Sequence, residues 1–417
     1  FHINKPTRRT LVRTIQLLRK YCLGDRPVGF RVLKFGAEGD AGYGLSGGQA
    51  PNFEDADLNI GLPVFALHGN HDDPSGVEHL SAMDLLDASR LLNYFGKTRT
   101  VAERGGGESR IQIRPVLLEK GRTRVALYGM GWINDARCAR MFRTQGQVEW
   151  LRPGDSEEYP AQGWFNVFAV HQNRNYAGAK NHLSENLLPP FLDLVVWGHE
   201  HESIPRPAAV KDCRCKVLQA GSTVATSLNE GEAKPKHCFL LEVNQTKWRL
   251  NPVALRSVRP MAIDRMVWRG HNATEQQQKD FRLQVTARLE DLVDQAAAKA
   301  SGSDSVLPLV RLQIQHERGV PIPLAQLMQQ FVGRVANPGD VIGLQVNKAR
   351  VKASEASKAE HGAVERAKQM HDLISSHLPE LQVLHAEKMQ GAIGSFVEKE
   401  EKKAIEQYVR RAMESAK

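Results

Sequence analysis

Three short apolar runs in this chain each end in a cluster of His, Asn and acidic side chains. Residues 62–67 precede H-G-N-H-D-D (68–73), residues 164–170 precede H-Q-N-R-N (171–175), and residues 192–197 precede G-H-E-H-E (198–202). Apolar runs of this length are typical of buried strands. Because groups at the carboxyl ends of strands in an α/β sheet face one crevice, the sequence predicts that these three clusters converge.

The pattern up to about residue 256 is that of a layered α/β domain. Three further apolar runs, 124–130, 216–220 and 238–243, have the length and composition of buried strands. Thr7 is predicted to cap a helix over residues 7–22, where apolar side chains recur at helical spacing.

The rest of the chain divides into three segments with different patterns. Residues 257–347 combine an amphipathic helix near 281–296 with a strand at 309–315 and a short helix at 324–335, which predicts a small α+β unit. Residues 348–378 have little apolar periodicity and are interpreted as a linker. Residues 379–417 regain an apolar stripe, which must pack back on the protein or dock on a partner; we favour a partner.

Charge and cysteine content narrow the class of protein. The 417 residues include 56 Lys and Arg against 47 Asp and Glu, a formal net charge of +9. This excess favours a polyanionic partner, nucleic acid first and an acidic membrane surface second, although it is also common among soluble proteins. No run approaches about 18 apolar residues, so no membrane-spanning helix is predicted. The five cysteines are scattered, which favours a reducing compartment.

The donor types in the three clusters point to a transition metal. A single histidine after a strand is most often a hydrogen-bonded surface residue, but three such clusters in this order make coincidence improbable. Imidazole and amide-oxygen ligands suit Mn²⁺, Fe²⁺ or Zn²⁺ better than Ca²⁺. Gly69 and Gly198 permit the tight backbone that exposes these side chains.

These clusters, together with longer runs, resemble a known family. G-N-H-D (69–72), His171 and G-H-x-H (198–201) are similar to the last three motifs of the calcineurin-like metallophosphoesterases. The branch that matches best is the eukaryotic double-strand-break repair nuclease of meiotic recombination. Similar to that branch are F-H-I-N-K-P-T-R (1–8), H-G-N-H-D-D-P-S-G (68–76), G-S-T-V-A-T-S-L (221–228), G-E-A-K-P-K-H (231–237) and F-V-G-R-V-A-N-P (331–338).

The resemblance covers nearly the whole chain and implies an architecture. It implies an α/β fold, the calcineurin-like phosphoesterase β-sandwich flanked by helices, with a small α+β cap domain and a helical C-terminal tail. Its parts would be a nuclease domain at 1–256, a DNA-binding cap at 257–347, a linker at 348–378 and a partner-binding segment at 379–417.

The resemblance also implies a two-metal site. Asn70, His171 and His199 would complete one Mn²⁺ site and His201 the other, so that two ions activate water and neutralise the phosphate oxygens. The family adds an upstream D-x-H and a G-D-x-F-H motif, and Phe1-His2 matches only the end of the second. We therefore expect that the 417 residues alone do not hold a complete two-metal centre, because two close cations need bridging negative charge.

The same resemblance assigns catalytic and DNA-contacting roles. His71 would contact the scissile phosphate and protonate the leaving oxygen, with Asp72 orienting its ring, and His2 is similar to a second catalytic histidine. The side chains expected to contact DNA phosphates are Asn173, Arg174 and Arg8, the first two because they adjoin a predicted ligand.

Three protein partners are implied. An SMC-like coiled-coil ATPase would dock on the tail through Ile393, Phe396, Val397, Ile405, Tyr408 and Val409. Family members form a homodimer through positions that match Leu11, Ile15, Leu18, Leu80, Met83 and Leu86, unless these are buried within one subunit. Residues 34–60 lie where the family engages a nibrin-like regulatory subunit; 51–60 resemble that region and 36–50 do not.

The implied function is that of a Mn²⁺-dependent DNA nuclease in the nucleus. It would act as a 3′–5′ exonuclease on duplex ends and as an endonuclease on single strands, and would process double-strand breaks in complex with the ATPase. Two alternatives stay open. One is a calcineurin-like phosphoesterase acting on another phosphate ester, and the other is a non-catalytic scaffold that tethers DNA within the same complex.

Overall fold

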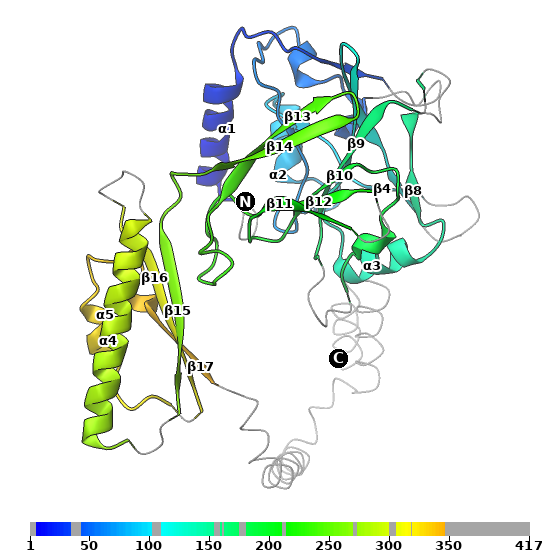
Figure 1. Ribbon diagram of the computed structural model, residues 1–417. Coiled ribbons are helices and arrows are strands. Elements are labelled where there is room, and N and C mark those ends of the chain that lie inside the picture. Colours follow the sequence, from blue (N-terminus) through cyan, green and yellow to red (C-terminus); the bar gives the residue numbers. More distant parts are fainter. Residues whose placement is uncertain are drawn as a thin grey trace, which may run out of the picture. The chain divides into compact units, whose positions relative to one another are not determined.

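The computed structural model describes most of the chain up to residue 346 (Figure 1). The described residues are 6–34, 43–101, 110–153, 159–160, 162–174, 181–210, 214–269, 273–299, 306–317 and 319–346. His2, the linker and the tail with its predicted partner-binding side chains lie outside these ranges. Among the described residues, no helix combines the length and the apolar character needed to cross a membrane.

A seven-stranded mixed sheet organises residues 31–219. Its order is β1 (Arg31–Leu33), β6 (Pro115–Lys120), β7 (Thr123–Met130), β9 (Trp164–His171), β10 (Leu194–Gly198), β12 (Lys216–Gln219) and β11 (Ile204–Ala209). The pairs β7–β9, β9–β10 and β10–β12 are parallel, and the others are antiparallel. The strands predicted at 124–130, 164–170, 192–197 and 216–220 are confirmed as its parallel core.

Both faces of this sheet are covered, as parallel strands require. On one face Tyr128, Phe168 and Trp197 pack in a cluster with residues of β5 (Arg110–Ile113) and α3 (Asp135–Arg143). β5 lies between β4 (Arg99–Val101) and β8 (Val148–Trp150) in a three-stranded sheet. On the other face Phe165 and Leu194 pack against the hairpin of β13 (His237–Asn244) and β14 (Lys247–Ala254). This layering agrees with the predicted α/β phosphoesterase fold.

The amino-terminal helix begins where the sequence predicts. α1 (Arg8–Cys22) is capped by the Thr7 side chain, which accepts a hydrogen bond from the Thr10 amide. α2 (Ala82–Ala88) is short and follows a turn in which Ser75 pairs with Leu80. β2 (Phe65–Ala66) precedes α2 and β3 (Asn93–Tyr94) follows it, and the two strands form a parallel pair.

Most of the side chains predicted to form a dimer interface pack inside the chain itself. Met83 and Leu86 are buried, and Leu11, Ile15 and Leu18 pack against the same cluster. Only Leu80 of the six is strongly exposed. Met83 and Leu86 are therefore buried within one subunit, which was the alternative to their predicted place in a homodimer interface. The outward-facing apolar side chains of α1 and α2 are instead Val12, Leu17, Tyr21 and Leu85.

The carboxyl-terminal described part is a three-stranded sheet with a long helix (Figure 1). Its elements are β15 (Met261–Trp268), α4 (Glu275–Ala298), β16 (Leu309–His316), α5 (Ala325–Gln329) and β17 (Ile342–Val346). The predicted apolar stripe of α4 is buried, and β16 alternates between buried and half-buried residues. The helix predicted at 324–335 is shorter than expected, because a turn with Gly333 in the left-handed region follows α5.

Short 3-10 helices occur in the connections. They are η1 (Ser46–Gly48), η2 (Asn52–Glu54), η4 (Glu185–Leu187) and η5 (Pro338–Asp340). The segment around η2 is anchored by two asparagines: the Asn52 amide donates to Asn93 Oδ1 at 2.7 Å, and Asn93 Nδ2 donates to Asn52 Oδ1 at 2.8 Å. Part of the region similar to the regulator-binding loop is thus fixed to β3.

Candidate active site

The three polar clusters meet at one end of the parallel strands, as predicted. β9 and β10 pair in parallel with His171 opposite Gly198, so the residues that follow both strands lie at the same edge. His171 Nε2 is 3.1 Å from Asn70 Oδ1, which comes from the turn after β2. The rings of His171 and His199 lie 5.3 Å apart between centroids, at an angle of 78°. Asn70, His171 and His199 therefore form one group.

Backbone geometry makes this convergence possible. A Cβ atom on Gly69 would lie 2.7 Å from His171 Cε1, so only glycine lets the turn approach the ring this closely. His199 has a φ of +77°, a left-handed conformation that is uncommon outside glycine and concentrates at functional sites. This turn directly after β10 brings the His199 ring beside His171.

Burial keeps the two histidines in the form that binds metals. It is the main cause that lowers the pKa of His171 to about 3, with the neighbouring histidines adding to it. The pKa of His199 is also lowered by burial, which outweighs the opposing carboxylates of Glu200 and Asp135. Both rings are therefore neutral at physiological pH, and only a neutral imidazole has a lone pair to give to a metal ion.

The donor set fits a first-row metal in kind. Two neutral imidazoles and an amide oxygen within one group are ligands that such ions accept. Within the described ranges, no three His, Cys, Asp or Glu side chains come together in a metal-binding geometry. The candidate ligand group therefore consists of two histidines, His171 and His199, and the amide oxygen of Asn70.

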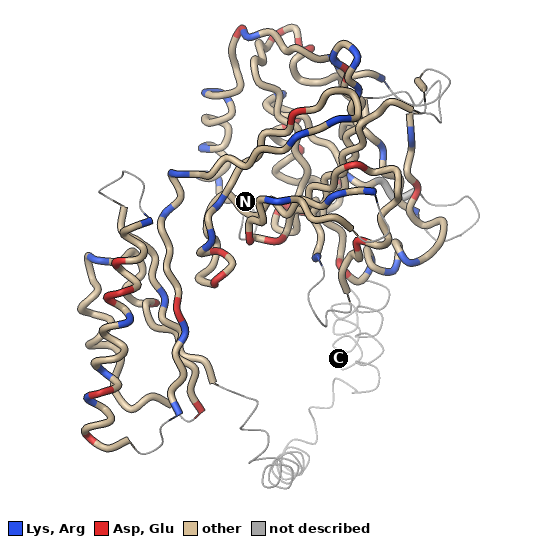
Figure 2. The backbone as a smooth tube through the Cα atoms, viewed as in Figure 1, with Lys and Arg blue, Asp and Glu red and all other residues tan. Residues whose placement is uncertain are grey.

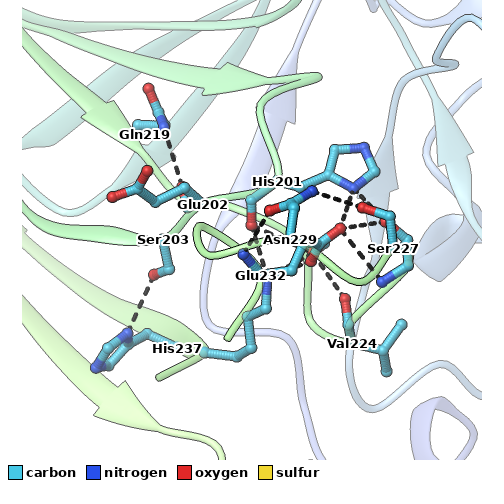
Figure 3. Close-up of polar contacts among 12 residues, drawn as sticks. His201, Glu202, Ser203, Gln219, Val224, Ser227, Asn229, Glu232 and His237 are labelled. Atoms are coloured by element: carbon cyan, nitrogen blue, oxygen red, sulfur yellow. Dashed lines mark hydrogen bonds and ion pairs between the residues drawn. The ribbon is translucent and has the colours of Figure 1, made fainter. Parts of the chain in front are cut away.

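His201 belongs to a second polar cluster, in which it lies beside Glu232 (Figure 3). Its Nδ1 lies 2.9 Å from Glu232 Oε1 and 2.5 Å from Thr226 Oγ1. Glu232 and Lys236 are both only 2% exposed, and Lys236 Nζ donates to Glu232 Oε2 at 2.7 Å. Although burial raises the pKa of Glu232, hydrogen bonds from Lys236, Thr226 and His201 outweigh it and bring that pKa to about 2. A buried carboxylate thus stays ionised beside His201.

The catalytic candidates lie in the turn after Asn70. His71 is half-buried, and Asp72 Oδ1 accepts a hydrogen bond from the Gly69 amide at 2.7 Å. Burial raises the pKa of Asp72, and this amide bond opposes the rise. The observed contact of Asp72 closes the turn, so its expected orientation of the His71 ring stays a prediction.

Sequence reasoning gave no role to His68, which anchors the same turn. His68 Nε2 lies 3.2 Å from the Trp132 carbonyl, and Nδ1 lies 2.7 Å from the Tyr94 hydroxyl. Because a carbonyl only accepts, Nε2 carries the proton and Nδ1 accepts from Tyr94. Burial lowers the pKa of His68 to about 4, so Asp73 Oδ1 at 3.9 Å faces a neutral ring rather than an ion-pair partner.

The side chains expected to contact DNA have internal contacts. Arg174 Nε donates to Glu185 Oε1 at 2.6 Å and its Nη1 to Gln219 Oε1 at 2.8 Å. Asn173 Nδ2 donates to Asp135 Oδ2 at 2.9 Å. These bonds tie the loop after β9 to its neighbours, whereas Arg8 is exposed at the start of α1. Phosphate contact by any of the three stays a prediction.

Comparison with known proteins finds relatives for both described parts. The calcineurin-like phosphoesterase family matches residues 39–203, and the Mre11 DNA-binding presumed domain matches residues 248–396. The double-strand break repair protein MRE11 of Arabidopsis thaliana is 39% identical over 412 residues, which cover 97% of this chain and 56% of that protein. Its namesake in Homo sapiens is 36% identical over 443 residues, covering 99% and 59%. Over nearly its whole length, the chain is similar to MRE11 proteins.

This similarity confirms the resemblance drawn from the motifs, and the phosphoesterase match confirms the predicted fold. The chain spans between 56% and 59% of the length of these two relatives. The phosphoesterase match contains most strands of the central sheet, and the DNA-binding-domain match contains the strands of the β15–β17 sheet. The boundaries at residues 256 and 347 stay predictions.

Proposed function

We propose that this chain carries the nuclease and DNA-binding parts of a Mn²⁺-dependent enzyme that processes DNA double-strand breaks. The observation that supports this most is the group of Asn70, His171 and His199, joined by the 3.1 Å and 5.3 Å contacts at the edge of the parallel strands. A metallophosphoesterase fold and relatives named for double-strand break repair support the choice of substrate.

In this proposal four side chains of the site hold divalent ions. Asn70, His171 and His199 would bind one ion and His201 the other. When bound, such ions supply an activated water and neutralise charge on the attacked phosphate. The chain's own contribution is to keep His171 and His199 neutral by burial and to fix their rings at the strand ends.

Proton transfer would fall to His71. It directly follows Asn70, in a turn that the Asp72–Gly69 hydrogen bond closes. From there it would give a proton to the leaving oxygen as the phosphodiester bond breaks. His2, outside the described residues, would act beside it on the same phosphate.

DNA would be held through its backbone. The chain carries a formal net charge of +9, and Figure 2 shows Lys and Arg along both described parts. Residues 203–269 hold twelve Lys and Arg, yet Lys234, Lys236, Arg249 and Arg265 form ion pairs, so part of this charge is compensated. Contacts between Lys or Arg and DNA phosphates would suit an exonuclease on duplex ends and a single-strand endonuclease, because neither activity needs base recognition.

The partners proposed are an SMC-like coiled-coil ATPase, a second copy of the chain and a nibrin-like regulatory subunit. The ATPase would bind residues 379–417. The regulator would bind near residues 51–60, a segment that the buried hydrogen bonds between Asn52 and Asn93 fix to β3. Because the complex would act on chromosomal breaks, we expect it in the nucleus.

A comparison of substrates tests this function. Full-length protein with Mn²⁺ should degrade the ends of a DNA duplex and cut single strands, while turning over p-nitrophenyl phosphate far more slowly. Turnover of p-nitrophenyl phosphate without DNA cleavage would instead favour a phosphoesterase for another ester. DNA binding with no hydrolysis of either substrate would favour the non-catalytic scaffold.

A further inference from the structure

The environment of His201 differs from that of the other two histidines. His171 and His199 are kept neutral mainly by burial, but the His201 side chain is 34% exposed. Burial therefore cannot fix its proton or its ring orientation. The contact that can do so is the one between His201 Nδ1 and Glu232 Oε1, at 2.9 Å.

The chemistry of this contact selects a tautomer. An ionised carboxylate only accepts hydrogen bonds, so His201 Nδ1 must carry a proton and donate this hydrogen bond to Glu232. Thr226 reinforces this, because its hydroxyl donates to the same Glu232 oxygen and lies 2.5 Å from His201 Nδ1. In a neutral ring the lone pair then resides on Nε2, the nitrogen directed away from Glu232.

Lys236 holds both ends of this arrangement. Its Nζ donates to Glu232 Oε2 at 2.7 Å, to the His201 carbonyl at 2.7 Å and to Ser222 Oγ at 3.0 Å. One ammonium group thereby fixes both the Glu232 carboxylate and the backbone of His201, whose ring that carboxylate contacts. A buried ion pair seldom stabilises a fold more than apolar side chains of similar size would, so fold stability alone does not account for it.

We propose that Glu232 and Lys236 are positioning residues, which fix His201 so that its Nε2 binds a metal ion. The inference rests on the proposed function, because it takes His201 as a ligand. Carboxylates that orient metal-bound histidines typically change metal affinity by about 10- to 100-fold when they are removed. Glu232 would act in this way through Nδ1, and Lys236 would act through Glu232.

The test uses full-length protein and Mn²⁺ alone as the probe. Calorimetry and Mn²⁺ electron paramagnetic resonance would be compared for the wild type, Glu232→Gln and the double variant Glu232→Gln/Lys236→Met. The double variant removes both buried charges together, so it avoids an unpaired buried charge that would unfold the protein. Lys234→Met is the matched control, because Lys234 pairs with Glu202 at the surface and is 56% exposed.

The proposal predicts that Glu232→Gln and the double variant both bind one Mn²⁺ about 10- to 100-fold more weakly. Glu232→Gln leaves Lys236 buried without its ion pair and should unfold at a lower temperature, whereas the double variant should unfold near the wild type in the absence of metal. Lys234→Met should bind as the wild type does. Unchanged Mn²⁺ affinity in a folded double variant would overturn the positioning role and leave the proposed function standing. A wild type that binds no Mn²⁺ would overturn both.

Discussion

At the scale of single residues, three histidines from the polar clusters that follow the strands have different surroundings. His68 is buried between Tyr94 and Trp132 and serves as a structural donor and acceptor. His171 is half-buried beside Asn70, which suits a metal ligand. His201 is partly exposed and oriented by Glu232. Residue type alone therefore does not distinguish these histidines; their burial and the partner of each ring nitrogen do.

The close fit of His68 makes Gly131 a sensitive position. A Cβ atom there would lie 2.0 Å from His68 Cε1, so Gly131→Ala must displace a ring that Tyr94 and Trp132 hold. We expect a loss of about 1–3 kcal/mol in the free energy of unfolding, measured by urea denaturation. Gly339→Ala is the control, because nothing lies within 4 Å of its added carbon. Equal stability of both variants would refute this packing.

At the scale of elements, long buried strands could be predicted and contacts between loops could not. β7, β9 and β10 are covered on both faces, so their sequences are continuous apolar runs with a clear signal. β5 and α2 are too short for periodicity to identify them. The Glu232–His201 contact joins residues 31 positions apart within loops, where no period exists. Its only sequence signal was the pair of motifs at 221–228 and 231–237.

The start of α2 should be sensitive to acid. Although burial opposes it, hydrogen bonds from Lys97 and Ser81 lower the pKa of Asp84 below its ordinary value. The ionised carboxylate therefore stabilises the fold at pH values above the ordinary pKa. This contribution is lost as the pH falls through the lowered pKa of the folded state. Asp84→Asn should cost about 1 kcal/mol in unfolding free energy at pH 7 and less in acid.

Urea denaturation across pH measures this difference for Asp84. Asp57→Asn provides the comparison, because Asp57 is exposed and lies outside any helix cap. Its effect on unfolding free energy should be small at neutral pH. A cost for Asp84→Asn that does not shrink as the pH falls would show that its charge does not hold the helix start.

At the scale of the whole molecule, the proposed function requires electrostatic, sequence-independent binding of DNA. If six to ten phosphates are contacted, affinity should fall by about 10³- to 10⁵-fold between roughly 50 and 200 mM salt. Fluorescence anisotropy with two duplexes of unrelated sequence would measure this, and both should show the same slope. A flat salt response, or strong preference for one sequence, would contradict backbone binding.

The central claim is that the turn after β2 supplies both a metal ligand, Asn70, and a separate proton donor, His71. The most direct test is His71→Asn in full-length protein, with Mn²⁺ binding by calorimetry and DNA cleavage measured on the same sample. The account predicts unchanged Mn²⁺ affinity and abolished cleavage. Retained Mn²⁺-dependent cleavage in His71→Asn would contradict it.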